Sequence, residues 1–269
     1  MKKNEASPPQ QQAAQEKQEL LRQFFLDHPQ VGLAFSGGVD SAYLLWAASQ
    51  WAALVRPYYL AGPFQPAWER EEARLLAQQL GCRLTELEVS VLDQPQIRAN
   101  DGLRCYYCKR LMLGRLLDQA QAQGLPLLLD GNNASDPYES RPGMRAGQEL
   151  GVVSPLRLCG LTKEHIRQLS RQAGLFTWDK PSYSCLATRV ATGQKLLAQD
   201  LQRIEAGENL LRQLGFSDFR LRLQGETALL QVTAGQLEQA QKLGAELLNR
   251  LGQWFPRVSL DERPRPDSL

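Results

Sequence analysis

The stretch VGLAFSGGVDSAYLLW, residues 31–46, decides the fold of this chain. Its apolar start, residues 31–35, predicts a short buried strand, and the apolar run from residue 42 predicts a helix. The glycine-rich SGGVDS between them, residues 36–41, is either a plain strand–helix turn or a turn whose backbone N–H groups bind an anion. The turn lacks the lysine that a P-loop places on nucleotide phosphates, so γ-phosphate transfer fits it poorly.

Strands and helices alternate around this turn. The hydrophobic patterns predict helices over residues 15–26, 67–81 and 109–123, and further strands over residues 54–61, 83–92 and 125–131. Such alternation predicts an α/β fold with a parallel sheet, in which ligands bind at the carboxyl ends of the strands. The SGGVDS turn and the polar DGNNASD, residues 130–136, both follow predicted strands. We therefore expect both at one ligand-binding edge.

The pattern changes after about residue 189. An amphipathic helix is predicted over residues 199–216, followed by two alternating strands within residues 218–232, a helix over 235–253 and a strand within 256–262. This order predicts a small α+β domain over residues 190–269, behind an α/β domain over residues 15–189. Residues 1–14 are rich in Pro and Gln and predict a disordered tail.

Composition narrows the class of protein. Thirty-one basic residues against 29 acidic ones give a net charge of +2, which argues against a nucleic-acid partner. The sequence has no apolar run of the roughly 20 residues that span a bilayer, and its basic start has no apolar segment of a signal peptide behind it. We therefore expect a cytoplasmic protein without a membrane partner, whose five cysteines are reduced, metal-binding or catalytic.

Three cysteines stand in motif-like surroundings. Cys105 and Cys108 form a C-x-x-C within DGLRCYYCKR, and Cys185 lies within KPSYSCLATR. Spacing alone leaves an iron–sulfur cluster, a zinc site and unliganded thiols open, because a C-x-x-C pair serves each of them. Cys82 and Cys159 lack such neighbours, and we expect them to be structural.

In its context, SGGVDS resembles the pyrophosphatase loop (PP-loop) of the ATP pyrophosphatases. In that family the loop grips the β–γ pyrophosphate of ATP while a substrate oxygen attacks the α-phosphate. The resemblance implies that ATP is bound by Ser36, Gly37, Gly38, Val39, Asp40 and Ser41, with Gly131 and Asn132 from the second strand end. Asp40 is the catalytic candidate that organises Mg²⁺ or pyrophosphate, because a hard cation prefers carboxylate oxygen.

Four motifs in order, SGGVDS, CYYCK, DGNNASD and KPSYSCLATR, together with FRLRLQG, resemble the LarE sulfur transferases of nickel-pincer nucleotide biosynthesis. The resemblance runs from about residue 19 to residue 261. It implies an adenine nucleotide alpha-hydrolase-like domain that adenylates the carboxylates of pyridinium-3,5-biscarboxylic acid mononucleotide. Sulfur from sulfide or another donor then displaces AMP and leaves thiocarboxylates. The resemblance also implies a homo-oligomer.

The family has two sources of sulfur. One type sacrifices a single cysteine, whose position is that of Cys185, and the other binds a 4Fe–4S cluster on three cysteines. The additional pair, Cys105 and Cys108, makes this sequence resemble the cluster type. Cys185 is therefore both a metal-ligand candidate and, with Asp40, a catalytic candidate.

The resemblance also names substrate residues. Glu208, Arg220 and Arg222 match the family's substrate-site positions, and a guanidinium fork suits a phosphate or carboxylate. Arg189 and Lys180 flank the Cys185 loop, where we expect them to draw anions. The sequence departs from the family at Gln224, where His is usual, and in its shorter, proline-rich end.

Two other functions fit parts of the sequence. A tRNA thiolase of the PP-loop family would share the loop and the cluster, but it should carry a basic surface for the RNA backbone. A non-catalytic ATP-binding module stapled by zinc would need a fourth metal ligand near Cys105 and Cys108.

Overall fold

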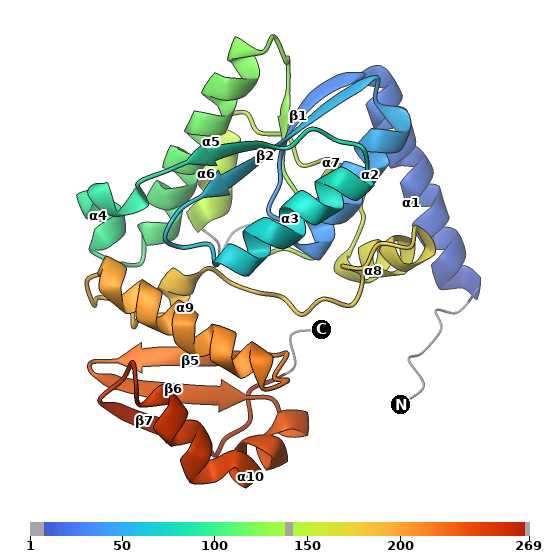
Figure 1. Ribbon diagram of the computed structural model, residues 1–269. Helices are drawn as coiled ribbons and strands as arrows, with labels where there is room; N and C mark the ends of the chain where they lie inside the picture. Colours follow the sequence, from blue (N-terminus) through green and yellow to red (C-terminus); the bar gives the residue numbers. More distant parts are fainter. Residues whose placement is uncertain (1–7, 138–141, 267–269) are drawn as a thin grey trace. The chain divides into compact units, whose positions relative to one another are not determined.

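The computed structural model describes residues 8–137 and 142–266, which fall into two compact units (Figure 1). The first unit comprises described residues of Met1–Ala61, Ala67–Val89 and Cys105–Lys180. The second comprises those of Gly62–Pro66, Ser90–Arg104 and Pro181–Leu269.

The first unit is built on a four-stranded parallel sheet in the order β3–β2–β1–β4. Its strands are β1 (Gln30–Ala34), β2 (Leu54–Ala61), β3 (Thr85–Glu88) and β4 (Leu128–Leu129). The central β1 pairs through Gly32 with Leu128 on one side and Arg56 on the other. A Cβ at Gly32 would lie 2.9 Å from the Tyr58 ring, so this strand needs glycine to let the ring approach. The predicted parallel sheet is confirmed.

Helices cover both faces of this sheet (Figure 1). One core is formed with α1 (Pro8–Asp27), α2 (Val39–Trp51), α3 (Ala67–Gln79) and α8 (Lys163–Gln172). The other is formed with α5 (Arg104–Ala122). Adjacent residues of β2 alternate between the two cores, because side chains of a strand point to opposite faces. The remaining helices of the unit are α6 (Pro142–Glu149) and α7 (Pro155–Leu158).

Several elements differ from their predicted bounds. The strand predicted over residues 83–92 is only β3, followed by the short helix η1 (Val91–Asp93), and β4 has two residues. Helix α5 begins at Arg104 rather than near residue 109, so the C-x-x-C pair lies inside its first turns. The sequence reasoning gave no bounds for α6, α7 or α8.

The second unit holds a three-stranded mixed sheet in the order β5–β6–β7. Its strands are β5 (Phe219–Gln224), β6 (Thr227–Val232) and β7 (Arg257–Leu260); β5 and β6 are antiparallel, and β6 and β7 are parallel. Its helices are η1, α4 (Pro95–Arg98), η2 (Leu186–Arg189), α9 (Ala198–Gln213) and α10 (Ala234–Leu251). The predicted small α+β fold is confirmed.

Glycine allows α9 to pack closely in this unit. A Cβ at Gly207 would lie 2.5 Å from the Leu221 side chain and 3.2 Å from the Phe255 ring. Across the described parts of both units, every helix is too short or too polar to cross a membrane.

Candidate functional site

The SGGVDS turn joins the end of β1 to the start of α2 in the first unit. Gly37 has a φ of +72°, a left-handed conformation that glycine adopts without strain, and Gly38 caps α2 with extended backbone. The Ser36 and Ser41 hydroxyls lie 3.0 Å apart, and the Ser41 hydroxyl donates to the Gly38 carbonyl at 3.2 Å. These bonds hold the turn closed around the N-terminus of α2, where backbone N–H groups favour an anion.

The second polar turn packs directly against the first. A Cβ at Gly131 would lie 3.0 Å from the Ser41 backbone nitrogen and 3.2 Å from its Cα. The two turns follow β1 and β4, which are neighbouring parallel strands. The structure therefore brings the two predicted parts of the ATP site together at the carboxyl edge of the sheet.

Asp40, in the first turn of α2, has a hydrogen-bond partner in the described part of the chain for only one of its two carboxyl oxygens. Its Oδ2 atom accepts from the Lys163 ammonium at 2.5 Å. Its Oδ1 atom is buried and has no hydrogen-bond partner within the described ranges. Burial raises the pKa of this carboxyl; the Lys163 charge opposes the shift and Asp136 adds to it. The carboxylate thus has one oxygen able to accept a further cation.

Asp130 organises the second turn. Its Oδ1 accepts from the Ser154 hydroxyl at 2.6 Å and from the Asn132 backbone N–H at 3.1 Å, while its Oδ2 accepts from the Asn132 side chain at 2.5 Å. Burial raises the pKa of Asp130, and the Ser154 hydrogen bond opposes that shift. Asn132 is predicted to contact ATP, but its side chain donates to Asp130 and so stabilises this turn.

Lys180 contacts the SGGVDS turn through the Gly37 carbonyl. Its ammonium donates to the Gly37 carbonyl at 3.2 Å and to Glu72 Oε2 at 2.5 Å, and it lies 4.8 Å from the centre of the Trp68 ring. The sequence reasoning grouped Lys180 with the Cys185 loop. The structure gives it these partners in the first unit, whereas Cys185 belongs to the second.

The three candidate metal ligands divide between the units. Cys105 and Cys108 lie one turn apart on α5, with Cys105 exposed and Cys108 half-buried. Cys185 precedes η2 in the second unit and is half-buried. Within residues 8–137 and 142–266, no group of three His, Cys, Asp or Glu side chains is arranged to hold a metal ion.

Helix α5 is tied to α6 beside the C-x-x-C pair. The Tyr106 hydroxyl donates to Glu149 at 2.6 Å and accepts from Arg110 at 2.9 Å. The Arg145 guanidinium lies 4.1 Å from the centre of the Tyr106 ring and pairs with Glu149 at 3.3 Å. These contacts fix the helix that carries Cys105 and Cys108.

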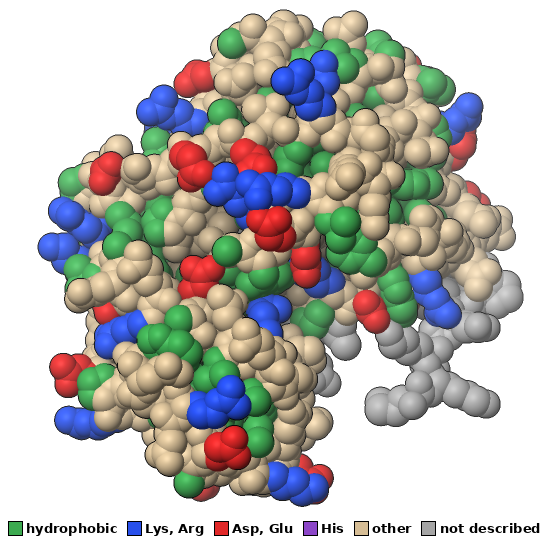
Figure 2. Space-filling view, viewed as in Figure 1, with side chains coloured by type: hydrophobic (Ala, Val, Ile, Leu, Met, Phe, Trp, Pro, Cys, Tyr) green, Lys and Arg blue, Asp and Glu red, His purple; other side chains and the backbone are tan. Residues whose placement is uncertain are grey.

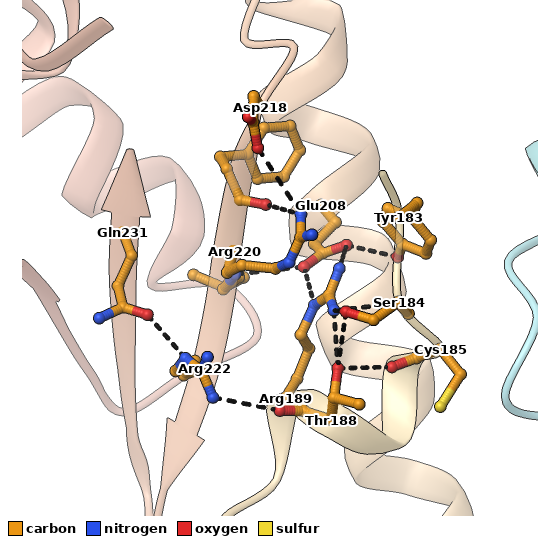
Figure 3. Close-up of polar contacts among 12 residues, drawn as sticks. Tyr183, Ser184, Cys185, Thr188, Arg189, Glu208, Asp218, Arg220, Arg222 and Gln231 are labelled. Atoms are coloured by element: carbon orange, nitrogen blue, oxygen red, sulfur yellow. Dashed lines mark hydrogen bonds and ion pairs between the residues drawn. The ribbon is translucent and has the colours of Figure 1, made fainter. Parts of the chain in front are cut away.

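A buried ion pair supports the Cys185 loop in the second unit (Figure 3). Arg189 and Glu208 have side-chain exposures of 0% and 1%, and Arg189 Nε lies 2.7 Å from Glu208 Oε1. Glu208 also accepts from the Tyr183 hydroxyl at 2.6 Å and the Leu221 backbone N–H at 3.1 Å. Burial lowers the pKa of Arg189, but Glu208 more than offsets this, so the net shift is upward. The Arg189 guanidinium therefore remains charged.

The same arginine fixes the backbone next to Cys185. Arg189 Nη1 donates to the Ser184 carbonyl at 3.0 Å and to the Thr188 hydroxyl at 2.9 Å. The Thr188 hydroxyl in turn donates to the Cys185 carbonyl at 2.8 Å (Figure 3). The predicted substrate residues Arg189 and Glu208 thus hold the loop of the candidate sulfur residue in one conformation.

Arg220 and Arg222 project from alternate positions of β5 toward this loop (Figure 3). Arg220 donates to the Ser182 carbonyl at 2.7 Å, and Arg222 donates to the Thr188 carbonyl at 3.3 Å. Burial, with Arg189 and Arg265 nearby, lowers the pKa of Arg220 to about 10, and the same causes lower that of Arg222. An arriving anion would relieve this crowding of positive charge.

Sequence reasoning missed two residues of the candidate ATP site in the first unit. Asp130 stands at the head of a turn that was recognised, but its role as the acceptor for Ser154 needs the fold. Lys163 comes from α8, for which the sequence reasoning gave no bounds. The sequence feature that could have revealed this helix is Thr162, which caps its N-terminus together with the His165 side chain.

Charges are mixed on the face shown in Figure 2. Basic side chains there lie among acidic ones rather than in one continuous patch. This view offers no support for the backbone-binding surface that a tRNA thiolase needs.

Comparison with known proteins gives three relatives, whereas no family model matches. The chain is 34% identical over 227 residues to the uncharacterized protein slr1717 of Synechocystis, covering 83% of this chain and 84% of the relative. It is 29% identical over 215 residues to pyridinium-3,5-bisthiocarboxylic acid mononucleotide synthase of Lactiplantibacillus plantarum, covering 78% and 77%. It is 26% identical over 200 residues to the uncharacterized protein MJ0830 of Methanocaldococcus jannaschii, covering 74% and 76%.

Proposed function

We propose that this chain is a LarE-type enzyme, which uses ATP to transfer sulfur to a small mononucleotide during cofactor biosynthesis. The similarity to the Lactiplantibacillus synthase supports an enzyme that makes a thiocarboxylate. The proposed substrate is pyridinium-3,5-biscarboxylic acid mononucleotide, and the proposed products include AMP and pyrophosphate. We place the enzyme in the cytoplasm, as a homo-oligomer.

One observation supports the use of ATP. Two glycine-containing turns pack together at the carboxyl ends of adjacent parallel strands, and the nearby Asp40 has a buried oxygen without a hydrogen-bond partner among the described residues. Nucleotides bind at such edges. The orphaned Asp40 Oδ1 fits Mg²⁺, which takes carboxylate oxygens, so Asp40 would hold the ion. Bound there, Mg²⁺ would supply positive charge beside the phosphates of ATP.

Adenylation needs a carboxylate oxygen of the substrate to attack the α-phosphorus of ATP. The new bond joins that oxygen to the α-phosphorus, and the bond to the bridging oxygen breaks, so pyrophosphate leaves with the electron pair. The N–H groups at the start of α2 and the Gly37 turn would hold the departing pyrophosphate. This use of the loop requires no lysine within it.

The second half replaces the adenylated oxygen with sulfur. A sulfur nucleophile attacks the carboxyl carbon of the acyl adenylate, and AMP leaves with the oxygen and its electron pair. Cys105 and Cys108 offer two sulfur ligands from one face of a helix, which is compatible with iron ligation, and the family resemblance names Cys185 as the third ligand. When bound, a 4Fe–4S cluster would present extra sulfide taken from an external donor, so that no cysteine of the chain is consumed.

The arginines of the second unit would hold the substrate anions. Arg220 and Arg222 carry depressed pKa values that the negative charge of a phosphate or carboxylate would relieve. The Arg189–Glu208 pair would act beneath them by fixing the Cys185 loop.

The test begins with protein isolated without oxygen. We expect a brown protein with iron and acid-labile sulfide, and release of AMP when ATP and the pyridinium dicarboxylate are added. Cys185→Ala should abolish thiocarboxylate formation but leave ATP binding intact, whereas Asp40→Ala should stop AMP release. A colourless protein with stoichiometric zinc would contradict the cluster, and undiminished sulfur transfer by the Cys185 variant would contradict its role.

A further inference from the structure

Lys163 reaches the PP-loop from a distant part of the chain. It is the first residue of α8, held there by the cap that Thr162 and His165 form. Its ammonium pairs with Asp40 Oδ2 at 2.5 Å, across 123 positions of sequence. The side chain keeps 33% of its surface exposed. A partly exposed lysine on a flexible stem can move to a new partner with little change in its surroundings.

The second lysine at this loop is held differently. Lys180 is only 15% exposed, and it bridges Glu72 and the Gly37 carbonyl above the Trp68 ring. Moving it would break an ion pair and a contact that supports the turn. Lys163, by contrast, has as its carboxylate partner the residue that would take a divalent cation. Of the two lysines, Lys163 is therefore the one that ligand binding would release.

We propose that Lys163 is the exchangeable cation of the PP-loop: it neutralises Asp40 in the nucleotide-free protein and pairs with the pyrophosphate of bound ATP. This inference rests on the proposed function. A divalent cation on Asp40 would remove the need for the ammonium there. Pyrophosphate that leaves the α-phosphorus gains the electron pair of the broken bond, and the ammonium would stabilise that charge.

The experiment compares two ligands on the full-length protein. Lys163→Met should weaken binding of magnesium pyrophosphate about tenfold, because a charge-assisted hydrogen bond is lost. AMP, which lacks the β- and γ-phosphates, should bind with an affinity within about twofold of the unaltered protein. Lys163→Arg should restore most of the pyrophosphate affinity. Lys195→Met removes an exposed lysine of the second unit and serves as the matched control. Isothermal titration calorimetry gives both affinities.

Each outcome decides the proposal. A selective loss for pyrophosphate with rescue by arginine supports it. Unchanged pyrophosphate binding overturns it, and so does an equal loss for pyrophosphate and AMP, because Lys163 would then act only by shaping the loop. If the unaltered protein binds neither ligand, the ATP-dependent function itself fails; if it binds both and the variants do not differ, only the role of Lys163 fails. Thermal unfolding of Lys163→Met and Lys163→Arg checks that both are folded.

Discussion

The two units build their candidate sites in opposite ways. In the first unit the backbone makes the site: Gly37 turns the chain in a left-handed conformation, and Gly131 packs against the backbone of Ser41. In the second unit side chains make it, because the buried Arg189–Glu208 pair cross-links β5, α9 and the Cys185 loop (Figure 3). A site formed by closely packed backbone should lose stability and ligand affinity when a glycine is replaced by a larger residue. A site held by a buried ion pair should lose stability when one of the two charged partners is removed.

The largest expected effect is in the second unit. Glu208→Ala leaves the Arg189 guanidinium buried without its carboxylate partner, and such a loss costs about 3–5 kcal/mol of unfolding free energy. Urea unfolding at neutral pH measures this cost. Arg222→Ala, on an exposed side chain of the same site, should change the unfolding free energy by no more than about 1 kcal/mol.

A double variant separates charge from packing in this result. Replacing both members of the pair, as Arg189→Met with Glu208→Leu, should recover much of the stability, because no buried charge remains. Equal losses for Glu208→Ala and Arg222→Ala would remove the distinction between a buried support and an exposed contact.

The next effect is a steric one in the first unit. Gly131→Ala adds a methyl group 3.0 Å from the Ser41 backbone nitrogen, and backbone cannot swing aside as a flexible side chain can. We expect a loss of about 1–3 kcal/mol of unfolding free energy. ATP affinity should fall as well, because the two turns must separate. Chemical unfolding and calorimetric titration with ATP measure the two effects.

Gly114→Ala is the matched control in the same unit. A Cβ at Gly114, inside α5, would meet nothing within 4 Å, so the substitution should stabilise the helix by about 0.5–1 kcal/mol. If Gly131→Ala behaved like Gly114→Ala, with unchanged ATP affinity, the contact between the two turns would have no part in binding.

Sequence alone predicted the first unit well for a physical reason. Buried parallel strands are apolar runs bounded by polar turns, so VGLAF and LVRPYYLA could be recognised with the turns that follow the strands. The edge strand β3 and the two-residue β4 were predicted too long, because their apolar flanks continue beyond the ladder. Helix α8 has only ten residues, and its polar sequence hid both the helix and Lys163.

The partners of charged side chains were the part that sequence could not supply. Lys180 stands five residues before Cys185 in the sequence, yet its ammonium contacts Gly37 and Glu72. The family resemblance named Glu208 as a substrate residue, and Arg189 was a candidate because it flanks the Cys185 loop. Neither indication showed that the two pair with each other in full burial. Such pairings join segments many residues apart, and a single sequence contains no record of them.

The smallest expected effect is that of replacing Lys180, whose side chain contacts the backbone of the SGGVDS turn. Lys180→Met removes the ion pair with Glu72 and the donor to the Gly37 carbonyl, which together should cost about 1 kcal/mol. Glu72→Gln breaks the ion pair but leaves the lysine able to reach Gly37, so it should cost less. Differential scanning calorimetry gives the two melting temperatures, and titration with ATP gives the two affinities.

The two variants together show whether a side chain contributes to the backbone site of the first unit. If Lys180→Met weakens ATP binding while Glu72→Gln does not, the bond to the Gly37 carbonyl supports the loop, and side-chain support contributes to the backbone site as well. If both variants lose the same stability and bind ATP normally, Lys180 contributes only through its ion pair with Glu72. The turn would then be held by its own glycines and by the hydrogen bonds of Ser36 and Ser41.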